Sequence, residues 1–155
     1  VRGRGFYMKA IDCSTLYLPF LCKALNYYPT RLAQCIVCVE DGKPIAGAIY
    51  DCYNQLSITA HIWTDPENVP MREWYAAIFD YPFNRLGVTQ IVGQVAGNNI
   101  EAQKLDEHFG FVEAGRIKEY SEDGDLILYV MKRENCTILN SERWAKVVEI
   151  VKRIA

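Results

Sequence analysis

Segment 98–111 constrains the fold of this chain more than any other part of the sequence. Asn98 stands three residues before Glu101, the spacing of a helix start at which a side-chain oxygen caps a free backbone N–H and the glutamate reaches back. Gly110 stands where a left-handed residue ends a helix, and Phe111 then leads into a strand. The pattern predicts a helix of about three turns. The side chains expected on its buried face are Ala102, Leu105 and Phe109.

The segments around this helix have the alternation and the turn residues of β-strands. Residues 89–95 are β-branched and apolar, and residues 111–130 form two strand-like runs around the turn 121–124. Upstream, the pattern predicts a helix over 15–26 that is capped by Ser14. The strands predicted before the central helix cover 6–11, 35–40, 44–53 and 56–63. This order indicates an α+β fold around one mostly antiparallel sheet.

The spacing of these residues resembles the GNAT superfamily, the acyl-CoA-dependent N-acyltransferases. The matching positions are Asn99, Ala102, Leu105 and Gly110-Phe111, with Tyr81-Pro82-Phe83, Leu86-Gly87-Val88, Gly93 and Val95 upstream. Segment 81–132 is most similar to the branch that includes the ribosomal-protein alanine acetyltransferases, and it also resembles members carried by tailed bacteriophages. Ala114 and Lys118 depart from that branch, which usually has glutamate and arginine there. The resemblance implies a GNAT-like fold, with a twisted, mostly antiparallel sheet of six to seven strands flanked by helices, in which strands four and five splay apart.

Size and charge favour one compact domain. The 155 residues are 50% hydrophobic, which allows a chain of this length to bury roughly two-thirds of its unfolded surface without disulfides or metals. We therefore expect a single GNAT-like acetyltransferase domain over 1–155. A net charge of −2 leaves no basic footprint for nucleic acid or an anionic membrane. No apolar run is long enough for a membrane span. The polar start without an initiator methionine predicts a chain trimmed at that end and no signal peptide, so a cytoplasmic location is expected.

Residues 141–154 have the pattern of a capped amphipathic helix at the C-terminal end. Packing on its own domain is favoured over a partner site, because an apolar stripe at helical spacing usually faces the core. The residues of this stripe are Trp144, Val147, Val148, Val151 and Ile154.

The six cysteines raise the question of a metal or redox site, and Cys35-x-x-Cys38 is the candidate. Both cysteines lie in a strand-like run, where positions three apart point to opposite faces of the sheet. That geometry disfavours a zinc pair and a redox module, and no second pair completes a tetrahedral set. We expect buried, reduced thiols and no metal.

The resemblance places the pyrophosphate of acyl-CoA in segment 64–74, at the start of the helix after strand four. A helix N-terminus offers free N–H groups and the positive end of the helix dipole to an anion. Pro70 suits the first helical position, which leaves the N–H groups of Met71, Arg72 and Glu73 free. Arg72 has two interpretations, a phosphate contact and a solvated first-turn side chain.

This loop is also the largest departure from the resemblance. The family's glycine-rich loop is missing, and Val69 and Met71 stand near the positions where small residues let the backbone approach phosphate. Asp65, Glu67 and Glu73 add negative charge where an anion is expected to bind. Surviving N–H donors still support retained binding. The cofactor-binding residues implied by the resemblance are Ile62, Trp63, Met71, Arg72, Glu73, Asn99 and Ala102, and Asn99 is also a helix-start residue.

His61 and Asp106 are the candidate catalytic residues. His61 lies on one face of the predicted fourth strand, and an unperturbed imidazole already accepts a proton near neutral pH; a purely structural histidine is the alternative. Asp106 stands seven residues after Asn99, where the family often has a tyrosine that protonates the leaving thiolate. A carboxyl group can do this at neutral pH only if its pKa is raised. His108 is expected to be solvated.

Two functions are consistent with this sequence. The first is an N-acetyltransferase that uses acetyl-CoA, without a metal, to acetylate a primary amine of a small molecule or protein. Its acceptor is expected between the helix 15–26, the strand 55–63 and the hairpin 120–126. The second is a catalytically inactive GNAT-fold protein-binding module in which the altered phosphate loop records the loss of acetyl-CoA. The sequence does not distinguish a monomer from a homodimer.

Overall fold

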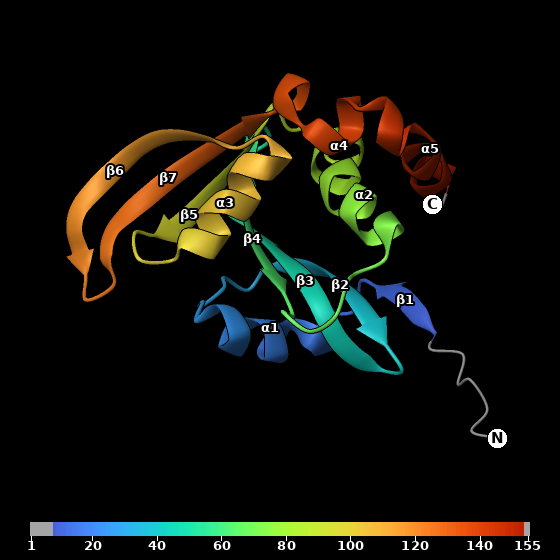
Figure 1. The fold of residues 1–155 in the computed structure, drawn as a ribbon, viewed down its shortest axis with the longest axis horizontal. Coiled ribbons are helices and arrows are strands. Elements are labelled where there is room, and N and C mark those ends of the chain that lie inside the picture. Colours follow the sequence, from blue (N-terminus) through green and yellow to red (C-terminus); the bar gives the residue numbers. More distant parts are fainter. Residues whose placement is uncertain (1–7, 154–155) are drawn as a thin grey trace.

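The computed structural model describes residues 8–153, which form one seven-stranded sheet flanked by helices on both faces (Figure 1). The strand order is β1-β2-β3-β4-β5-β7-β6, and every neighbouring pair is antiparallel except β4 and β5. The strands are β1 Lys9–Asp12, β2 Gln34–Glu40, β3 Lys43–Asp51, β4 Ser57–Thr64, β5 Gln90–Ala96, β6 Val112–Ser121 and β7 Gly124–Lys132. The predicted mostly antiparallel sheet is confirmed. The predicted first strand begins partly outside the described residues.

The helices divide unequally between the two faces of the sheet (Figure 1). A single helix, α1, covers one face, and the others cover the opposite face. The helices are α1 Leu18–Leu25, α2 Arg72–Asp80, α3 Ile100–Phe109, α4 Thr137–Asn140 and α5 Ala145–Arg153. Short helical turns cover Thr15–Tyr17, Tyr81–Arg85, Arg133–Asn135 and Glu142–Trp144. The predicted helix 15–26 is thus a short 3-10 turn followed by α1, and the side chain of Ser14 caps it as expected.

Side-chain alternation along the strands produces two hydrophobic clusters, one under α1 and one under the other helices. Cys35 belongs to the α1 cluster, whereas Cys38 belongs to the cluster under α2. The two thiols of the Cys-x-x-Cys motif therefore lie on opposite faces of β2, as the strand periodicity predicts. All six cysteines are free thiols, but Cys13 and Cys52 are exposed, which corrects the expectation that the thiols are buried.

Strands β4 and β5 diverge after a short stretch of pairing, as the resemblance implies. Their register runs from Ser57 opposite Gln90 to Thr59 opposite Val92 and then stops. Beyond that point β4 pairs only with β3, and β5 pairs only with β7. Within residues 8–153, no backbone hydrogen bond joins 60–64 to 93–96. A wedge-shaped gap therefore opens towards the carboxyl ends of the two strands.

Two buried hydrogen bonds hold α2 beside this gap. The indole N–H of Trp74 donates to the carbonyl of Ile36 at 3.0 Å, and the Tyr50 hydroxyl donates to the carbonyl of Ile78. Pro82 ends the regular helix, because it lacks an N–H and crowds the preceding turn. A wider π-helical turn over Tyr81–Arg85 follows, closed by the Leu86 N–H on the Tyr81 carbonyl.

Helix α3 begins one residue later than predicted. Asn99 is its N-cap, and its side-chain oxygen accepts from the Ala102 N–H at 3.1 Å. The amide of Asn98 donates instead to Asp123 in the β6–β7 turn, so a tertiary contact decides between two adjacent asparagines. Gly110 ends the helix with a φ of 112°. A β-carbon there would overlap the Asn135 carbonyl oxygen, so only glycine fits.

The C-terminal segment packs on α2, as predicted from its apolar stripe. Val148 and Val151 are buried, and Trp144 and Val147 pack against the same cluster; Ile154 lies outside the described residues. The helix proper starts at Ala145 after a 3-10 turn, and the side chain of Ser141 makes no capping bond, which corrects the predicted cap.

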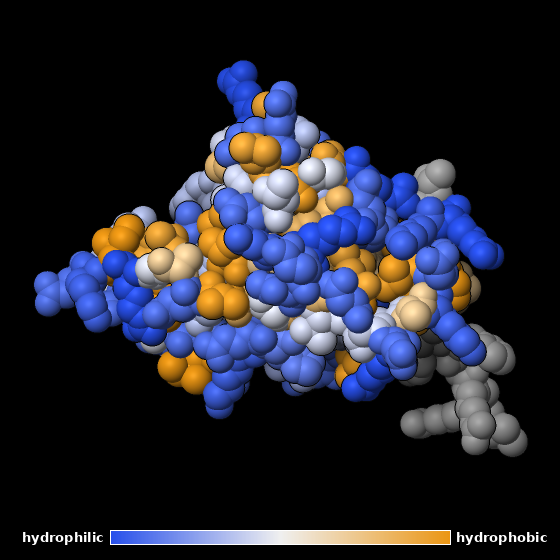
Figure 2. All heavy atoms as spheres, turned by 90° about the horizontal axis from the view of Figure 1, so that it is seen from above, coloured by the Kyte–Doolittle hydropathy of each residue, from blue (hydrophilic) through white to orange (hydrophobic). Residues whose placement is uncertain are grey.

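None of the helices in residues 8–153 combines the length and the apolarity that a helix needs to cross a bilayer. Strand β6 is exposed along most of its length, including Val112, Ile117 and Tyr120. Figure 2 shows one face, on which hydrophobic side chains lie scattered among hydrophilic ones.

Candidate active site

The gap between β4 and β5 offers unpaired backbone groups from two strands. In a strand, alternate N–H and C=O groups face each neighbour, so the groups of 60–64 that face β5 have no strand partner. Unpaired backbone groups need a partner, which water or an extended ligand with amide groups can supply. The unpaired groups of β4 are therefore the type of partner that the amides of an extended chain such as pantetheine require.

His61 lies on the diverging part of β4, on the α1 face of the sheet. Its imidazole stacks on the ring of Tyr27, with the centroids 3.9 Å apart and the planes inclined by 29°. Burial lowers the pKa of His61 below the ordinary value, and the negative charge of Asp51 acts in the opposite direction. The imidazole is therefore neutral at pH 7 and able to accept a proton.

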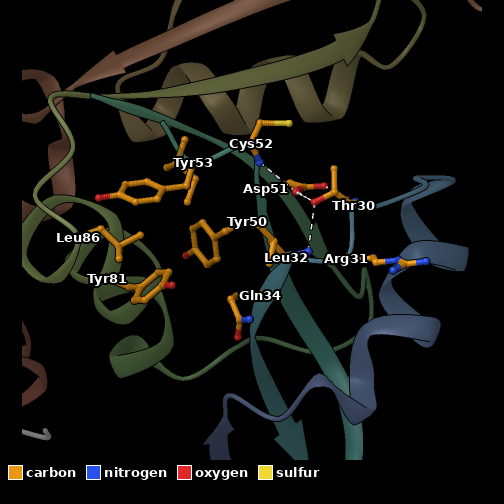
Figure 3. A pocket seen from close by; sticks show the side chains of 11 residues that line it. Thr30, Arg31, Leu32, Gln34, Tyr50, Asp51, Cys52, Tyr53, Tyr81 and Leu86 are labelled. Atoms are coloured by element: carbon orange, nitrogen blue, oxygen red, sulfur yellow. Dashed lines mark hydrogen bonds between the residues drawn. The ribbon is translucent and has the colours of Figure 1, made fainter. Parts of the chain in front are cut away.

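Asp51, at the end of β3, anchors the residues around His61. Its carboxylate is buried and accepts a hydrogen bond from the Tyr27 hydroxyl at 2.8 Å. It also accepts from the N–H and hydroxyl of Thr30 and from the Cys52 N–H, and Figure 3 shows Thr30 and Cys52 beside Asp51. Burial acts to raise the pKa of Asp51, but the bonds from Thr30, Tyr27 and Cys52 outweigh it, so the pKa lies below the ordinary value. Asp51 is thus a fixed negative charge near His61.

Asp106 lies on the opposite face of the sheet, on α3, at the point where the strands separate. A β-carbon built on Gly93, the first residue of β5 after its pairing with β4 ends, would lie 3.5 Å from the Asp106 Oδ2 atom. Asp106 is 9% exposed. Burial, followed by the charge of Glu107, raises the pKa of the Asp106 carboxyl to about 7. The condition that an acid role requires, a raised pKa, is therefore met.

In the loop after β4, the Asp65 carboxylate accepts hydrogen bonds at the place where the resemblance expects a phosphate. The Asp65 carboxylate accepts from the Glu67 N–H at 2.9 Å and from the Asn68 amide at 3.0 Å. The Asn68 N–H also points back, to the Asp65 carbonyl. Hydrogen bonds, first from the Glu67 N–H, lower the pKa of Asp65, so it is an anion at neutral pH. Three donors of the loop, the backbone N–H groups of Glu67 and Asn68 and the side-chain amide of Asn68, are thus already used.

The start of α2 corrects the predicted position of Pro70. Met71 is the N-cap and is extended, so Arg72 is the first helical residue and Pro70 precedes the cap. The Met71 N–H interacts with the Cys38 thiol and partly offsets the rise that burial causes in the pKa of that thiol. The N–H groups of Arg72 and Glu73 are left as the free donors at this helix start.

The predicted cofactor-binding side chains do not gather in one place. The guanidinium of Arg72 donates to the Arg143 carbonyl at 2.8 Å and lies 4.4 Å from the centroid of Trp144, so it contacts the C-terminal segment. Ile62 packs on the α2 face, whereas Trp63 packs on the α1 face against Phe20.

The other predicted contacts lie around the two helix starts. Met71 is half-buried in the α2 cluster, while Val69 is 74% exposed, so its side chain does not close the entrance. The side chain of Asn99 is engaged in capping α3, and Ala102 packs against the core. His108 is exposed, as predicted.

A polar cavity of ≈ 620 Å³ lies beside the open end of the gap. It is formed by the end of α1, the end of β5, the start of α3 and the β6–β7 hairpin, and its lining includes Asn26, Ala96, Tyr120 and Asp123. The acceptor was expected between the helix 15–26, the strand 55–63 and the hairpin 120–126. The helix and the hairpin line this cavity, whereas no residue of the strand is among its lining residues. No group of three or more histidine, cysteine, aspartate or glutamate side chains in residues 8–153 has the arrangement of a metal site.

Three site residues escaped the sequence prediction: Tyr27, Asp51 and Asp65 in its role as a loop acceptor. Tyr27 and Asp51 have no local motif, because their contacts join residues 24 and 34 positions apart on different elements. Asp65 had a usable signal, since aspartate two residues before a backbone N–H commonly forms an Asx-turn.

Solved structures that resemble this chain identify its fold. The sequence matches no protein-family model and no curated protein. Mutant forms of the spermidine/spermine N-acetyltransferase SpeG from Vibrio cholerae match with a TM-score of 0.65 and 20% identity, over 86% of this chain and 98% of that one. The dodecameric spermidine N-acetyltransferase from the same organism in an intermediate state matches with a TM-score of 0.66 and 19% identity, over 85% and 96%. At this identity the likeness shows the fold alone, and that fold is the GNAT fold.

Proposed function

We propose that this protein is an N-acetyltransferase that transfers an acetyl group from acetyl-CoA to a primary amine. The observation that carries the proposal is the gap between β4 and β5, which has a candidate base on one face and a candidate acid on the other. Amide formation needs a neutral amine and a protonated leaving thiol. The two faces of one gap supply the two groups that these proton transfers require.

The chain's residues divide these tasks. His61 takes a proton from the attacking amine, because burial keeps its imidazole neutral. Asp106 gives a proton to the departing thiolate, because burial raises the pKa of its carboxyl to about 7, which leaves about half of the carboxyl groups protonated at pH 7. Bulk water then returns the proton from the imidazolium to the carboxylate. Acetyl-CoA, when bound, supplies the activated acetyl thioester.

The residues fit the two ends of acetyl-CoA unequally. Backbone groups of 60–64 suit the amides of a pantetheine chain, and the N–H groups of Arg72 and Glu73 are free for a phosphate. The negative charge of Asp65, and the hydrogen bonds that the loop already donates to this carboxylate, disfavour binding of the pyrophosphate. We therefore propose binding with weakened affinity at the phosphate end. The remaining predicted contacts, Ile62, Trp63, Met71, Asn99 and Ala102, belong to this proposal.

The acceptor is proposed to enter through the polar cavity next to the β6–β7 hairpin. Asp123 and Asp125 line it, which favours a cationic amine. Polyamines are one candidate class, since two of the structural neighbours are spermidine or spermidine/spermine N-acetyltransferases. A peptide N-terminus is another, from the resemblance to the ribosomal-protein alanine branch. Free thiols support a cytoplasmic location for this reaction.

A transfer assay tests the proposal. Purified protein is incubated with acetyl-CoA and separate panels of polyamines, monoamines, lysine peptides and peptides with free N-termini, and released thiol and acetylated product are measured together. The proposal expects thiol release that depends on one amine class. Thiol release without any amine, or no release with all panels, contradicts it.

Two contacts favour a second candidate, a GNAT-fold protein-binding module without catalysis. The loop after β4 donates its hydrogen bonds to its own Asp65 carboxylate, and Arg72 contacts Arg143 and Trp144. Loss of the cofactor explains both contacts without further assumptions. Under this candidate, acetyl-CoA does not bind at all.

A further inference from the structure

The contact between Tyr27 and His61 is unusual for a candidate base, because no hydrogen bond orients the imidazole. Within residues 8–153, His61 makes no hydrogen bond through its side chain, and its defined partner is the stacked ring of Tyr27. A catalytic histidine normally has its ring fixed by a hydrogen bond to one nitrogen. Here, ring stacking takes the place of that bond.

The ring of Tyr27 is itself fixed at both ends. Its hydroxyl donates to the buried Asp51 carboxylate at 2.8 Å. Its backbone N–H donates to the Cys22 carbonyl at 2.9 Å, where α1 ends in the left-handed residue Asn26 with a φ of 49°. A side chain held at its hydroxyl and at its backbone is a rigid platform for the imidazole.

Few titratable groups surround this pair. They are the Asp51 carboxylate at the end of β3, the Tyr27 phenol, and the thiols of Cys22 on α1 and Cys52 after β3. Burial, followed by the hydrogen bond to Asp51, raises the pKa of Tyr27 well above the ordinary value. The phenol is therefore neutral, and Asp51 is the anion that acts on His61.

We propose that Tyr27, anchored by Asp51, is the positioning residue that holds the imidazole of His61 in one orientation on the diverging part of β4. The proposal rests on the proposed function, in which His61 is the base, and deepens it. Tyr27 does not touch the reacting atoms. Its contribution is to keep the ring from rotating away from the acceptor, a loss that costs rate even when every reacting group is present.

Two substitutions of Tyr27 separate the ring from its anchor. Tyr27→Phe keeps a ring but loses the bond to Asp51, and Tyr27→Leu loses both. Tyr28→Leu is the matched control, because the neighbouring Tyr28 is 91% exposed. The 155-residue sequence contains two histidines, so proton NMR of each variant follows His61 directly, with His108→Gln assigning the second signal. The kcat for the best amine and the affinity for acetyl-CoA are measured alongside.

We expect Tyr27→Leu to move the His61 ring signals, because the ring current of a stacked tyrosine is lost, and to lower kcat by about tenfold or more. The affinity of Tyr27→Leu for acetyl-CoA stays unchanged. The kcat and the His61 signals of Tyr27→Phe lie between those of the wild type and those of Tyr27→Leu, and Tyr28→Leu behaves as wild type. If Tyr27→Leu does not fold, Tyr27→Phe alone tests the proposal. A lowered kcat of Tyr27→Phe at unchanged acetyl-CoA affinity then supports the proposal, and a wild-type kcat contradicts it.

Unmoved His61 signals in Tyr27→Leu overturn the proposal whatever the kcat, and moved signals with a wild-type kcat overturn it too. The outcome is separable from the proposed function. An inactive wild type refutes the function, whereas the NMR comparison still tests whether Tyr27 holds the ring.

Discussion

His61 and Asp106 lie on opposite faces of the sheet, on either side of the gap where β4 and β5 separate. His61 stacks on Tyr27, which packs on the α1 face, whereas Asp106 lies on α3 beside Gly93. Burial moves their pKa values in opposite directions, downward for the histidine and upward for the aspartate. Both shifts bring a group to the protonation state that acyl transfer needs at neutral pH.

Replacement of His61 tests the base. We expect His61→Ala to lower kcat by about 10²-fold or more, because general-base catalysis typically contributes that much, while acetyl-CoA affinity persists. In the wild type, the acid limb of kcat/KM should lie below pH 6.5, the ordinary histidine pKa, because a base works unprotonated and burial lowers its pKa. His108→Ala, on an exposed residue, is the control. Full activity in His61→Ala refutes the role.

Asp106 links activity to stability. A carboxyl with a pKa of 3.8 in the unfolded chain and about 7 in the folded one makes the protein lose stability as pH rises between those values. Above pH 7, the free energy of unfolding is lower than at pH values below 3.8 by up to about 4 kcal/mol. Asp106→Asn should remove this pH dependence in denaturant titrations at pH 4–8 and also lower kcat. An unchanged slope of stability against pH contradicts the raised pKa.

Removal of the negative charge of Asp65 is expected to raise the affinity for acetyl-CoA. Asp65→Asn keeps an oxygen that can accept from the Glu67 N–H but removes the charge that opposes a pyrophosphate. We expect acetyl-CoA to bind severalfold more tightly, most clearly at low ionic strength, as calorimetry can measure. Glu149→Gln on α5 is a charge-matched control. If Asp65→Asn binds more weakly, the loop does not face the phosphates.

At Gly110, substitution by alanine adds one methyl group and is expected to lower the stability of the fold strongly. A β-carbon there would overlap the backbone oxygen of Asn135 at a φ of 112°, so Gly110→Ala should cost about 3 kcal/mol or more. Gly87→Ala is the comparison, since its φ is 71° but nothing lies within 4 Å, and about 1 kcal/mol of backbone strain is expected. Equal melting temperatures for the two variants would disprove the clash.

Much of this fold follows from local patterns in the sequence. Strand alternation separates Cys35 from Cys38, and Gly110 ends α3, because each feature depends on residues a few positions apart. The errors lie where a distant contact decides. Asn98 and Asn99 are equally good caps in isolation, and the bond from Asn98 to Asp123 selects Asn99. Met71 is extended above Cys38, which displaces the start of α2 beyond Pro70.

The candidate site was less predictable than the fold. The resemblance marks the position of Asp106, and the strand pattern together with imidazole chemistry points to His61; the catalytic roles of both stay predictions. The sequence does not reveal the burial that shifts the pKa values of the two side chains. The ring of Tyr27 meets His61 only after α1 has packed on the sheet. Contacts of this kind depend on three elements at once, so no pattern in a single segment predicts them.

Titration calorimetry of the wild type with acetyl-CoA tests the central claim most directly, with a thermal shift series as a second readout. A ligand that binds the folded state raises the melting temperature by mass action. We predict saturable binding of one acetyl-CoA per chain, retained in His61→Ala, and a melting temperature that rises with ligand concentration. No heat of binding and no shift at millimolar acetyl-CoA would contradict the transferase account and favour the protein-binding module.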